Sequence, residues 1–531
     1  MMNRLHFSLV VLILALLGGC ASLPPGSDFP KQKSTALDRP EQTPLGRQFD
    51  SAVRKHSGNS GFRIIPVGAD GFLVRMQMIN AAQSTLDLQY FIFRGDETGR
   101  LLTAAVLHAA DRGVRVRVLV DDGETIAGDD QISALEAHPS VEIRIFNPFR
   151  YRGHSMLLRA TEFMFNSARL DYRMHNKLMV VDNAIALIGG RNIGDQYFQM
   201  DPESQFADDD VFAAGPITGQ LSATFDEYWN SDLAIPTQAL SGGMPSHAAL
   251  HEQREALHEQ GRQLQADGAD YAKQVASGEP FIGITSGRLP LVWAHAQLVC
   301  DSPDKKKVEN GVTVGWLMHK AVADVTNAVQ SELLMVTPYL IPGHEGMKIF
   351  QDLRQRNVRV RILTSSLESS VVLPAQSGYM HYRVPLLESG VELYEVRSLL
   401  GNTKGSGETA AISRYGNYAL HAKLFVFDRQ KLFIGSMNFD QRSMHLNTEI
   451  GLIIDSPELA QQIATRFEAM VQPANSYALA LRPNETGKPA GLVWRTQESG
   501  KAVEYDKEPA RSNWQRIKVN MLSLLPLDKE L

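Results

Sequence analysis

The chain carries one short pattern of residues twice, and this duplication limits its fold more than any other feature. In each copy a lysine follows a histidine by two residues, an aspartate by seven and an asparagine by seventeen. The first copy comprises His175, Lys177, Asp182 and Asn192, and the second comprises His421, Lys423, Asp428 and Asn438. Two copies in a chain of 531 residues indicate two similar core domains.

The segments before each copy repeat the same order of predicted elements. Alternating β-branched and aromatic residues predict strands, and leucines and alanines at helical spacing predict helices. The expected order is strand 86–92, helix 100–112 and strand 113–120 in the first half, and strand 333–336, helix 346–356 and strand 358–363 in the second. Such units favour parallel pairing, so we expect an α/β fold of two similar βαβ-rich sandwich domains related by a pseudo-two-fold axis.

Each pattern places an imidazole and an ammonium group side by side. Residues i and i+2 of a strand point to one face, so His175 emerges with Lys177, and His421 with Lys423. Four apolar residues then lead to the aspartate, as expected for a strand that enters a buried sheet. If the two domains pack around a common axis, the two pairs face each other.

Two opposed histidine-lysine pairs suit chemistry at a phosphate ester. One histidine can attack phosphorus and form a covalent intermediate, while the other protonates the leaving oxygen and then deprotonates the acceptor. The lysines and asparagines can hold the non-bridging oxygens and stabilise charge in the transition state. We therefore expect neither a metal ion nor a cofactor, because the protein's own cations supply the positive charge.

Each histidine also needs a partner that orients its second ring nitrogen, commonly a carboxylate. The second half offers Glu449, and the first half offers the acidic run 208–210. Within that run we expect Asp210 to be the partner, because it directly precedes the next apolar strand. Asp182 and Asp428 belong to the repeated signature, and the sequence leaves open whether they serve the chemistry or the turn after the strand.

The composition restricts the kinds of partner that the protein is expected to bind. The formal net charge is −6, which argues against a general nucleic-acid binder, because such proteins usually show a basic footprint. Only two cysteines are present, Cys20 and Cys300, so the fold depends on its core and not on a disulfide framework.

The first residues predict export. A charged start is followed by an apolar run too short for a comfortable transmembrane helix, which identifies residues 1–19 as a signal peptide. The run ends in Leu17-Gly18-Gly19-Cys20, which resembles a bacterial lipobox and implies acylation of Cys20. Because Ala21 follows, the resemblance to the bacterial sorting rule favours a lipid anchor in the outer membrane, facing the periplasm, over retention at the inner membrane. The proline-rich stretch 20–47 reads as a flexible tether.

The repeated pattern resembles the signature of the phospholipase D superfamily, and the resemblance covers about residues 62–479. It is similar in particular to the bacterial cardiolipin synthase C-type branch. The residues that carry this narrower similarity are Phe146-Asn147-Pro148-Phe149, Arg173-Met174-His175-Asn176-Lys177, Gly189-Gly190-Arg191-Asn192-Ile193-Gly194-Asp195, Gly435-Ser436-Met437-Asn438-Phe439-Asp440, Arg442-Ser443 and Asn447-Thr448-Glu449.

The resemblance implies a reaction and its residues. The family works through a phosphohistidine, with His175 as the implied nucleophile, and this branch moves a phosphatidyl unit onto phosphatidylglycerol to give cardiolipin. The implied catalytic positions are His175, Lys177, Asn192, His421, Lys423, Ser436 and Asn438. The implied partners are a membrane surface and phospholipids: phosphatidylglycerol, with phosphatidylethanolamine as a second candidate. No nucleic acid is expected. Some cardiolipin synthases have transmembrane helices, whereas this chain departs from them in its lipobox-like sequence before Cys20.

The domain boundaries follow from these segments. We expect a first phospholipase D-like domain over 48–236 with its motif at 169–196, a helical insertion over 237–280, a second domain over 281–480 with its motif at 415–442, and a C-terminal extension over 481–531. The insertion carries three histidines, which we interpret as a solvated helix face. Segment 401–413 is expected to be a mobile loop near the site. The extension contains an amphipathic helix, either at a lipid interface or docked on the protein.

Three functions remain open at this point. The first is phosphatidyl transfer, as in cardiolipin synthesis. The second is hydrolysis of phospholipid or nucleic acid by the same residues, because the motifs do not specify the acceptor. The third is a membrane-tethered scaffold without catalysis, against which both motifs argue because both are intact.

Overall fold

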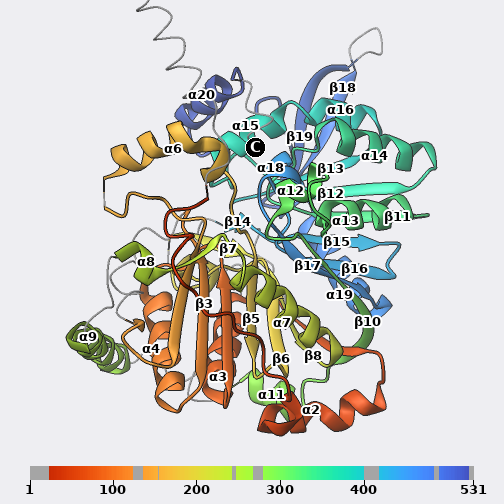
Figure 1. The fold of residues 1–531 in the computed structure, drawn as a ribbon. Helices are drawn as coiled ribbons and strands as arrows, with labels where there is room; N and C mark the ends of the chain where they lie inside the picture. Colours follow the sequence, from red (N-terminus) through yellow and green to blue (C-terminus); the bar gives the residue numbers. More distant parts are fainter. Residues whose placement is uncertain are drawn as a thin grey trace, which may run out of the picture.

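The structure is a computed structural model that describes residues 23–123, 135–153, 155–201, 203–241, 247–266, 279–399, 418–483 and 489–525. Its backbone is built around a run of 18 hydrogen-bonded strands with helices on both faces (Figure 1). The predicted signal peptide, Cys20 and the loop 401–413 lie outside the described residues.

The first half contains the strands and helices that the sequence pattern predicts. Its strands are β1 (Ser60–Ile65), β2 (Thr85–Tyr90), β3 (Arg115–Asp121), β4 (Val141–Phe146), β5 (Lys177–Val181), β6 (Ile185–Gly189), β7 (Gln205–Ala207), β8 (Asp210–Ala214) and β9 (Ala234–Pro236). Its main helices are α3 (Gly68–Ala81), α4 (Glu97–Asp111), α6 (Met156–Leu170) and α7 (Pro216–Trp229). The first pattern lies at the start of β5, which pairs with β2.

The second half repeats this order. Its strands are β10 (Val292–Cys300), β11 (Glu332–Val336), β12 (Arg359–Ser365), β13 (Glu392–Val396), β14 (Tyr418–Leu420), β15 (Leu424–Phe427), β16 (Lys431–Gly435) and β17 (Ile450–Asp455). Its helices include α12 (Lys305–Glu309), α13 (Met318–Asn327), α14 (Gly343–Gln355), α15 (Leu373–Met380), α16 (Arg383–Glu388), α18 (Gln441–His445) and α19 (Pro457–Met470).

Strand pairing shows the pseudo-two-fold symmetry directly. In the first half neighbouring strands follow the order β4-β3-β2-β5-β6-β8-β1, and in the second the order β13-β12-β11-β15-β16-β17-β10. The two runs join through antiparallel pairing of β1 with β10, where Ser60 lies opposite Ala294. The expected duplicated α/β architecture is therefore confirmed.

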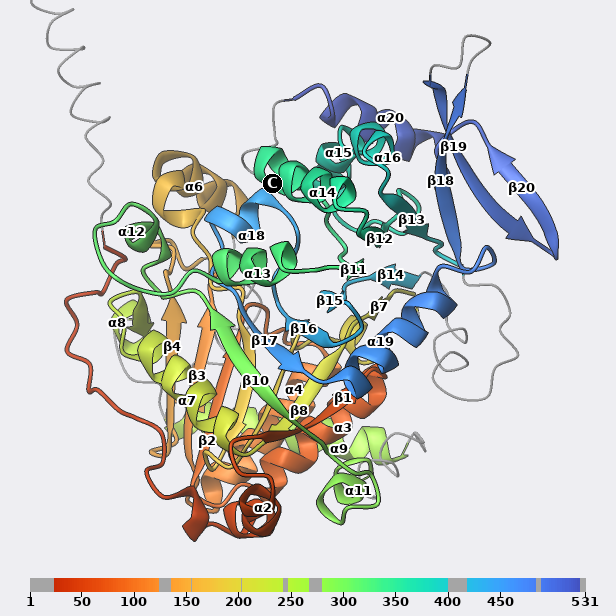
Figure 2. The ribbon, with the colours of Figure 1, turned by 90° about the vertical axis from the view of Figure 1, so that its right-hand side faces the viewer.

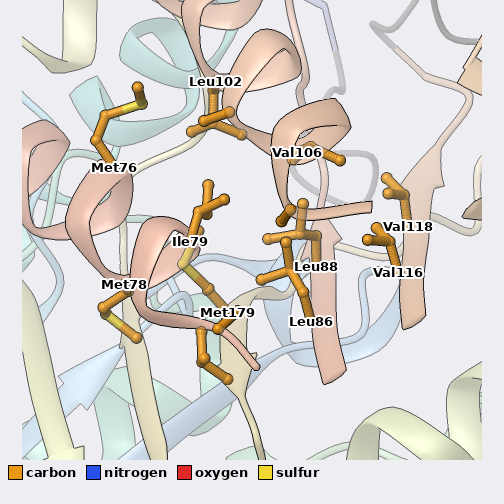
Figure 3. Close-up of a cluster of buried hydrophobic side chains, with 14 of the residues drawn as sticks. Met76, Met78, Ile79, Leu86, Leu88, Leu102, Val106, Val116, Val118 and Met179 are labelled. Atoms are coloured by element: carbon orange, nitrogen blue, oxygen red, sulfur yellow. The ribbon is translucent and has the colours of Figure 1, made fainter. Parts of the chain in front are cut away.

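Three apolar clusters hold the layers together. One packs α3 and α4 on the outer face of the first sheet, where Ile79, Leu88 and Leu102 are buried (Figure 3). A second does the same for α14 and its neighbours in the other half. The third takes residues from both halves, including Trp229 of α7 and Phe467 of α19. Since this central cluster belongs to neither half alone, the two domains are fused along their shared face.

The expectation of a flexible tether over 20–47 is wrong for the part that the structure describes. Lys31 donates to the carbonyl of Ala234 at 3.1 Å, and the backbone N–H of Ala36 donates to Asp226 Oδ2 at 2.7 Å. The prolines restrict the backbone, which lowers the entropy lost when an irregular segment packs along a domain. Helix α2 (Pro44–Lys55) then begins before the expected domain boundary.

The insertion and the C-terminal extension differ in how well the sequence pattern predicts them. The insertion includes the expected helices, α8 (Thr237–Ser241) and α9 (His247–Ala266), before α11 (Phe281–Thr285). The extension contains the expected helix, α20 (Asn513–Leu522), but also strands that the pattern did not indicate. These strands, β18 (Ser476–Pro483), β19 (Pro489–Glu498) and β20 (Lys501–Tyr505), continue the second sheet beyond β13.

Candidate active site

The backbone of each histidine is tied to the opposite domain. The N–H of His175 donates to the carbonyl of Thr448 at 2.9 Å, and the N–H of Thr448 donates to Arg173 at 2.9 Å. In the other motif β14 pairs in parallel with β7, and the N–H of His421 donates to the carbonyl of Ala207 at 2.8 Å. The two motifs therefore meet between the halves, where β7 and β14 lie in the middle of the molecule (Figure 1).

Each histidine also contacts a carboxylate from the opposite domain. Oε2 of Glu449 lies 2.8 Å from Nδ1 of His175, and Oδ2 of Asp208 lies 2.5 Å from Nδ1 of His421. Both histidine side chains are 9% exposed. Because Nδ1 is occupied in each ring, Nε2 is the nitrogen that each histidine can present to a substrate.

The structure corrects the expectation for Asp210. Its carboxylate contacts no histidine: Oδ2 pairs with Arg75 Nη1 at 2.8 Å and with Arg191 Nη1 at 3.0 Å. Strand register explains the shift, since Gly189 lies opposite Asp210 while Gly435 lies opposite Gly451. Counting two residues back from each partner gives Asp208 and Glu449. Aligning the two acidic segments on the glycines of the motifs would have found Asp208.

The lysines lie beside their histidines, as the spacing predicts. Both are 1% exposed. Nζ of Lys177 donates to the carbonyl of His175 at 2.5 Å, and Nζ of Lys423 contacts the carbonyl of His421 and, at 3.0 Å, its Nδ1. We assign the proton of that Nδ1 to the shorter contact, with Asp208. Each ammonium is thus held where it can reach an anion between the histidines.

The asparagines and Ser436 are placed differently from one another. Asn192 is engaged on both sides, because its Oδ1 accepts from the N–H of Ile92 at 3.1 Å and its Nδ2 donates to the Tyr197 hydroxyl at 2.9 Å. Among the described residues, Oδ1 of buried Asn438 has no hydrogen-bond partner. The Ser436 hydroxyl donates to Glu449 Oε2 at 2.5 Å, so it orients the carboxylate that contacts His175.

Asp182 and Asp428 lie away from the histidines. The Asp182 carboxylate accepts from three successive backbone N–H groups, those of residues 83–85 before β2, and Asp428 does the same for residues 330–332 before β11. Both follow the strand whose other end carries the lysine, a distance of about 16 Å at the usual rise. The sequence left their role open between the chemistry and the turn after the strand, and the geometry favours a structural role: each aspartate fixes the start of the neighbouring strand.

Two further residues hold the first histidine's partner, and the sequence reasoning missed them. Nζ of buried Lys305 binds Asp301 Oδ2 at 3.0 Å and the carbonyls of Ser443 and Asn447 at 2.8 Å. The same Asp301 oxygen accepts the backbone N–H of Glu449 at 3.0 Å. A lysine four residues after an aspartate is common, so the sequence pattern gave no usable signal here.

Burial dominates the electrostatics of the site. It lowers the pKa of His175 well below its usual value, with help from Lys177 and Lys423. It likewise lowers the pKa of Lys423 to about 8 and raises the pKa of Glu449 to about 7. Burial opposes the charge of Asp208 as well, but the contact with His421 and the nearby cations outweigh it and lower the pKa of that carboxyl. The imidazoles are thus neutral, and Asp208 is ionised.

Two kinds of feature are absent from the described residues. There, no group of three or more histidine, cysteine, aspartate or glutamate side chains is arranged to hold a metal ion. Across the same residues, no helix has the length and apolar character needed to cross a membrane.

Comparison with known proteins agrees with this geometry. The family model for "Cardiolipin synthase, PLD-like domain" matches residues 76–229 and 322–471, one stretch in each half. Cardiolipin synthase C of Escherichia coli (strain K12) is 35% identical over 89% of this chain and 97% of its own. The major cardiolipin synthase of Bacillus subtilis (strain 168) is 24% identical over 76% of this chain and 67% of its own.

A solved structure shares the fold. The crystal structure of phosphatidylserine synthase from Haemophilus influenzae Rd KW20 superposes with a TM-score of 0.51 at 12% sequence identity, covering 81% of this chain and 91% of that one. The duplicated sheet with two opposed motifs is thus the fold of phospholipase D-type enzymes. This chain belongs to the cardiolipin synthase family with phospholipase D-like domains.

Substitutions of Asp208 and of Asp210 should have different effects, one on turnover and the other on stability. Asp210→Ala leaves two buried guanidinium groups without their carboxylate, and we expect the free energy of unfolding to fall by about 3–5 kcal/mol. Asp208→Asn keeps the shape but removes the charge beside His421, and we expect turnover to fall by roughly a hundredfold or more with little loss of stability. Urea unfolding and initial rates, measured on both variants, separate the two roles. Equal activity loss in two equally stable variants would contradict them.

In the second motif, the roles of Asp428 and Lys423 can be separated in the same way, by stability and turnover. Asp428→Ala removes the acceptor of three backbone N–H groups, so we expect a loss of about 1–2 kcal/mol in stability and nearly unchanged turnover. Lys423→Ala should abolish most turnover. Because the pKa of the Asp428 carboxyl is lowered in the fold, its contribution is present above the ordinary value of 3.8 and is lost as the pH falls through the lowered pKa. A large drop in turnover for Asp428→Ala would assign this residue to the chemistry.

Proposed function

We propose that the protein is a phosphatidyltransferase that makes cardiolipin from phosphatidylglycerol through a phosphohistidine intermediate. The observation that carries this proposal is the pair of histidine-carboxylate contacts, each formed across the two domains. A site of this kind exists only where the halves meet, and it presents two Nε2 atoms with two buried ammonium groups. The identity to cardiolipin synthase C over nearly the whole of both chains supports the same reaction.

In the first half-reaction, the Nε2 lone pair of His175 attacks phosphorus. The bond from phosphorus to the headgroup oxygen breaks, and His421 gives its Nε2 proton to that oxygen. The products are a free headgroup alcohol and a phosphatidyl group on His175. Lys177, Lys423 and Asn438 face the non-bridging oxygens, whose charge their N–H groups stabilise.

In the second half-reaction, the free hydroxyl of a phosphatidylglycerol headgroup attacks the phosphohistidine. His421 takes its proton, and the bond from phosphorus to Nε2 of His175 breaks. Over both half-reactions together, phosphatidylglycerol as donor gives cardiolipin and glycerol, and phosphatidylethanolamine as donor gives cardiolipin and ethanolamine. No electron transfer occurs in either step.

The two carboxylates support this division of roles. Asp208 is ionised, so it stabilises the imidazolium that His421 must become when it acts as acid. The pKa of His421 is lowered, first by burial and then by Lys423. An anionic phosphodiester between the lysines offsets part of their positive charge and raises the pKa of His421. Substrate binding therefore favours the protonated form of His421, which is the form that acts as the acid.

Aromatic rings favour transfer over hydrolysis as the fate of the intermediate. Phe91 lies edge-on to His175 with ring centroids 5.0 Å apart, and Tyr197 and Phe206 pack against His421 at 5.2 and 5.3 Å. These rings shield the histidines from water on the sides they cover. Hydrolysis by the same residues is the second candidate, because the catalytic set does not depend on the acceptor.

We also propose that Cys20 is acylated and anchors the protein to a bacterial membrane on its periplasmic side, with the outer membrane favoured. The support is the lipobox-like sequence before Cys20. Such an anchor would keep the site close to its phospholipid substrates.

Lipid products identify the reaction. The purified full chain is reconstituted in vesicles of phosphatidylglycerol and phosphatidylethanolamine, and the lipids are followed by mass spectrometry, with His421→Ala as the control. We expect cardiolipin with the intact chain only, and the released alcohol, glycerol or ethanolamine, names the donor. Phosphatidic acid without cardiolipin would establish the hydrolase. Turnover of neither lipid would remove the proposal.

The pH dependence tests the role of Glu449. Because the pKa of this buried carboxyl is raised to about 7, it loses its charge, and with it the contact that orients His175, as the pH falls below that value. We expect kcat/KM to fall on the acid side of about pH 7. Glu449→Gln should remove this limb and lower kcat by roughly a hundredfold or more. A variant that keeps the limb would show that the titrating group lies elsewhere.

A further inference from the structure

Two helices expose apolar side chains at one end of the molecule. In α6 only Arg159 and Leu170 are buried, although the helix has 15 residues. Its exposed apolar side chains, with their exposed fractions, are Met156 65%, Leu157 76%, Leu158 49%, Phe163 38%, Met164 70% and Phe165 78%. In and just after α20 they are Trp514 60%, Ile517 48%, Met521 64%, Leu524 84% and Leu525 50%. Scattered apolar residues are normal on a surface, whereas two such helices are not.

Figures 1 and 2, which share a vertical axis, both place α6 and α20 at the same end of the molecule, opposite α2 and α11. We name the apolar side chains of α6 and α20 together the apolar rim. The amphipathic spacing of the C-terminal helix had left two alternatives open, a helix at an interface or one docked on the protein. In the structure, the apolar side chains of α20 point outward and only Val519 is buried.

The two helices occupy equivalent places around the site. Arg159 of α6 donates to the carbonyl of Asp122, just after β3, at 2.7 Å. Gln515, in α20, donates to the carbonyl of Leu367, just after β12, at 2.7 Å. β3 and β12 correspond under the pseudo-two-fold symmetry. In each half, one exposed apolar helix therefore contacts the segment that follows the equivalent strand.

Both connections lead to a catalytic histidine. Asp121, at the end of β3, accepts the N–H of Met174 at 2.8 Å, one residue before His175. In the other half Glu368 Oε1 accepts the N–H of Ser398 at 2.9 Å, and the carbonyl of Ser398 accepts the N–H of Tyr418, three residues before His421. The apolar rim therefore flanks the site from both sides.

Several basic side chains lie along the rim, although the net charge of the whole chain is −6. Around α20 the contacts of the basic side chains are to neutral groups: Arg511 to the carbonyl of Glu368, Arg516 to the carbonyl of Glu508 and to Asn513, and Lys518 to the ring of Trp514. Beside α6, Lys306 donates to the carbonyl of Ala168 at 3.1 Å. Among the described residues, these cations have no carboxylate partner. Apolar side chains between such cations complement an anionic lipid surface, where the rings and aliphatic chains enter the interface and the cations meet phosphates.

We propose that α6 and α20 form a two-sided docking surface that seats the catalytic site on an anionic phospholipid bilayer. This inference takes the substrate from the proposed function, whereas the position of the docking surface follows from the apolar rim alone. With both helices in the interface, the junction of the two halves lies toward the headgroups. A lipid phosphodiester can then reach the histidines while its acyl chains stay in the membrane.

Site-specific labels test the contact directly in the full chain. Cysteine is introduced in turn at Leu157→Cys, at Ile517→Cys and, as the matched control, at Ile282→Cys, which is 45% exposed on α11 at the opposite end. The native Cys300 is buried and its pKa is raised to about 12 by that burial, so it does not compete for a thiol-reactive fluorophore. Cys20, the proposed acylation site, is replaced by serine in every labelled chain and in a matched chain without an introduced cysteine, so that it does not react either. Each labelled chain is reconstituted in phosphatidylglycerol vesicles and in neutral phosphatidylcholine vesicles.

We expect the emission of the labels at positions 157 and 517 to move to shorter wavelength in phosphatidylglycerol vesicles, while the label at 282 stays in water. Replacing the three cations near α20 together, Arg511→Gln, Arg516→Gln and Lys518→Gln, should reduce this shift and remove its dependence on salt. Labels at 157 and 517 that remain in water would overturn the proposal. So would a shift that needs no lipid and grows with protein concentration, because it would assign the rim to a second copy of this chain.

Activity assays test the docking surface and the proposed function separately. The double variant Leu157→Glu and Ile517→Glu should lose most activity on long-chain phosphatidylglycerol vesicles, yet keep it on dispersed short-chain phosphatidylglycerol. A labelled parent chain that docks but forms no product from either substrate defeats the proposed function alone. A parent that forms product while its labels stay in water defeats the docking surface alone.

Discussion

The two histidine-carboxylate pairs that cross the domain boundary are the interactions on which the site depends. Each half supplies a histidine and a lysine for its own motif, and a carboxylate for the motif of the other half. A single half would therefore hold a histidine with no orienting group. The shared apolar cluster around α7 and α19 fixes the two halves closely enough for contacts of this length.

The symmetry is broken where the chemistry needs two different histidines. At equivalent positions the first half has Gly190 and the second has Ser436. A Cβ atom at Gly190 would lie only 2.2 Å from Oδ1 of Asp208, so the aspartate approaches its strand more closely than any side chain there allows. In the second half the Ser436 hydroxyl binds the longer Glu449 instead. One carboxyl is consequently held with a lowered pKa and the other with a raised pKa, and one pair is better suited to stabilise an imidazolium.

Much of the fold could be predicted because its signals are local. Strand alternation and helical spacing depend on neighbouring residues, and the predicted strand 113–120 and helix 100–112 differ from β3 and α4 by only a few residues. The strands β18–β20 were missed, since they are stabilised by pairing with β13 and with one another and not by a strong pattern of their own. The segment after Leu23 was read as a tether because proline-rich sequence shows no periodicity, whereas its hydrogen bonds to Asp226 and Asn230 are tertiary.

The sequence by itself determined the duplication, the α/β class and the two histidine-lysine pairs, because these follow from spacing along the chain. Only the tertiary structure decided which acid faces which ring. Spacing alone does not distinguish Asp208 from Asp210. Asp210 begins β8 opposite Gly189, where its carboxylate meets Arg75 and Arg191, whereas Asp208 lies before that strand and meets His421. Likewise, residue spacing predicted an amphipathic C-terminal helix, but only packing decided that its apolar face remains exposed beside the site.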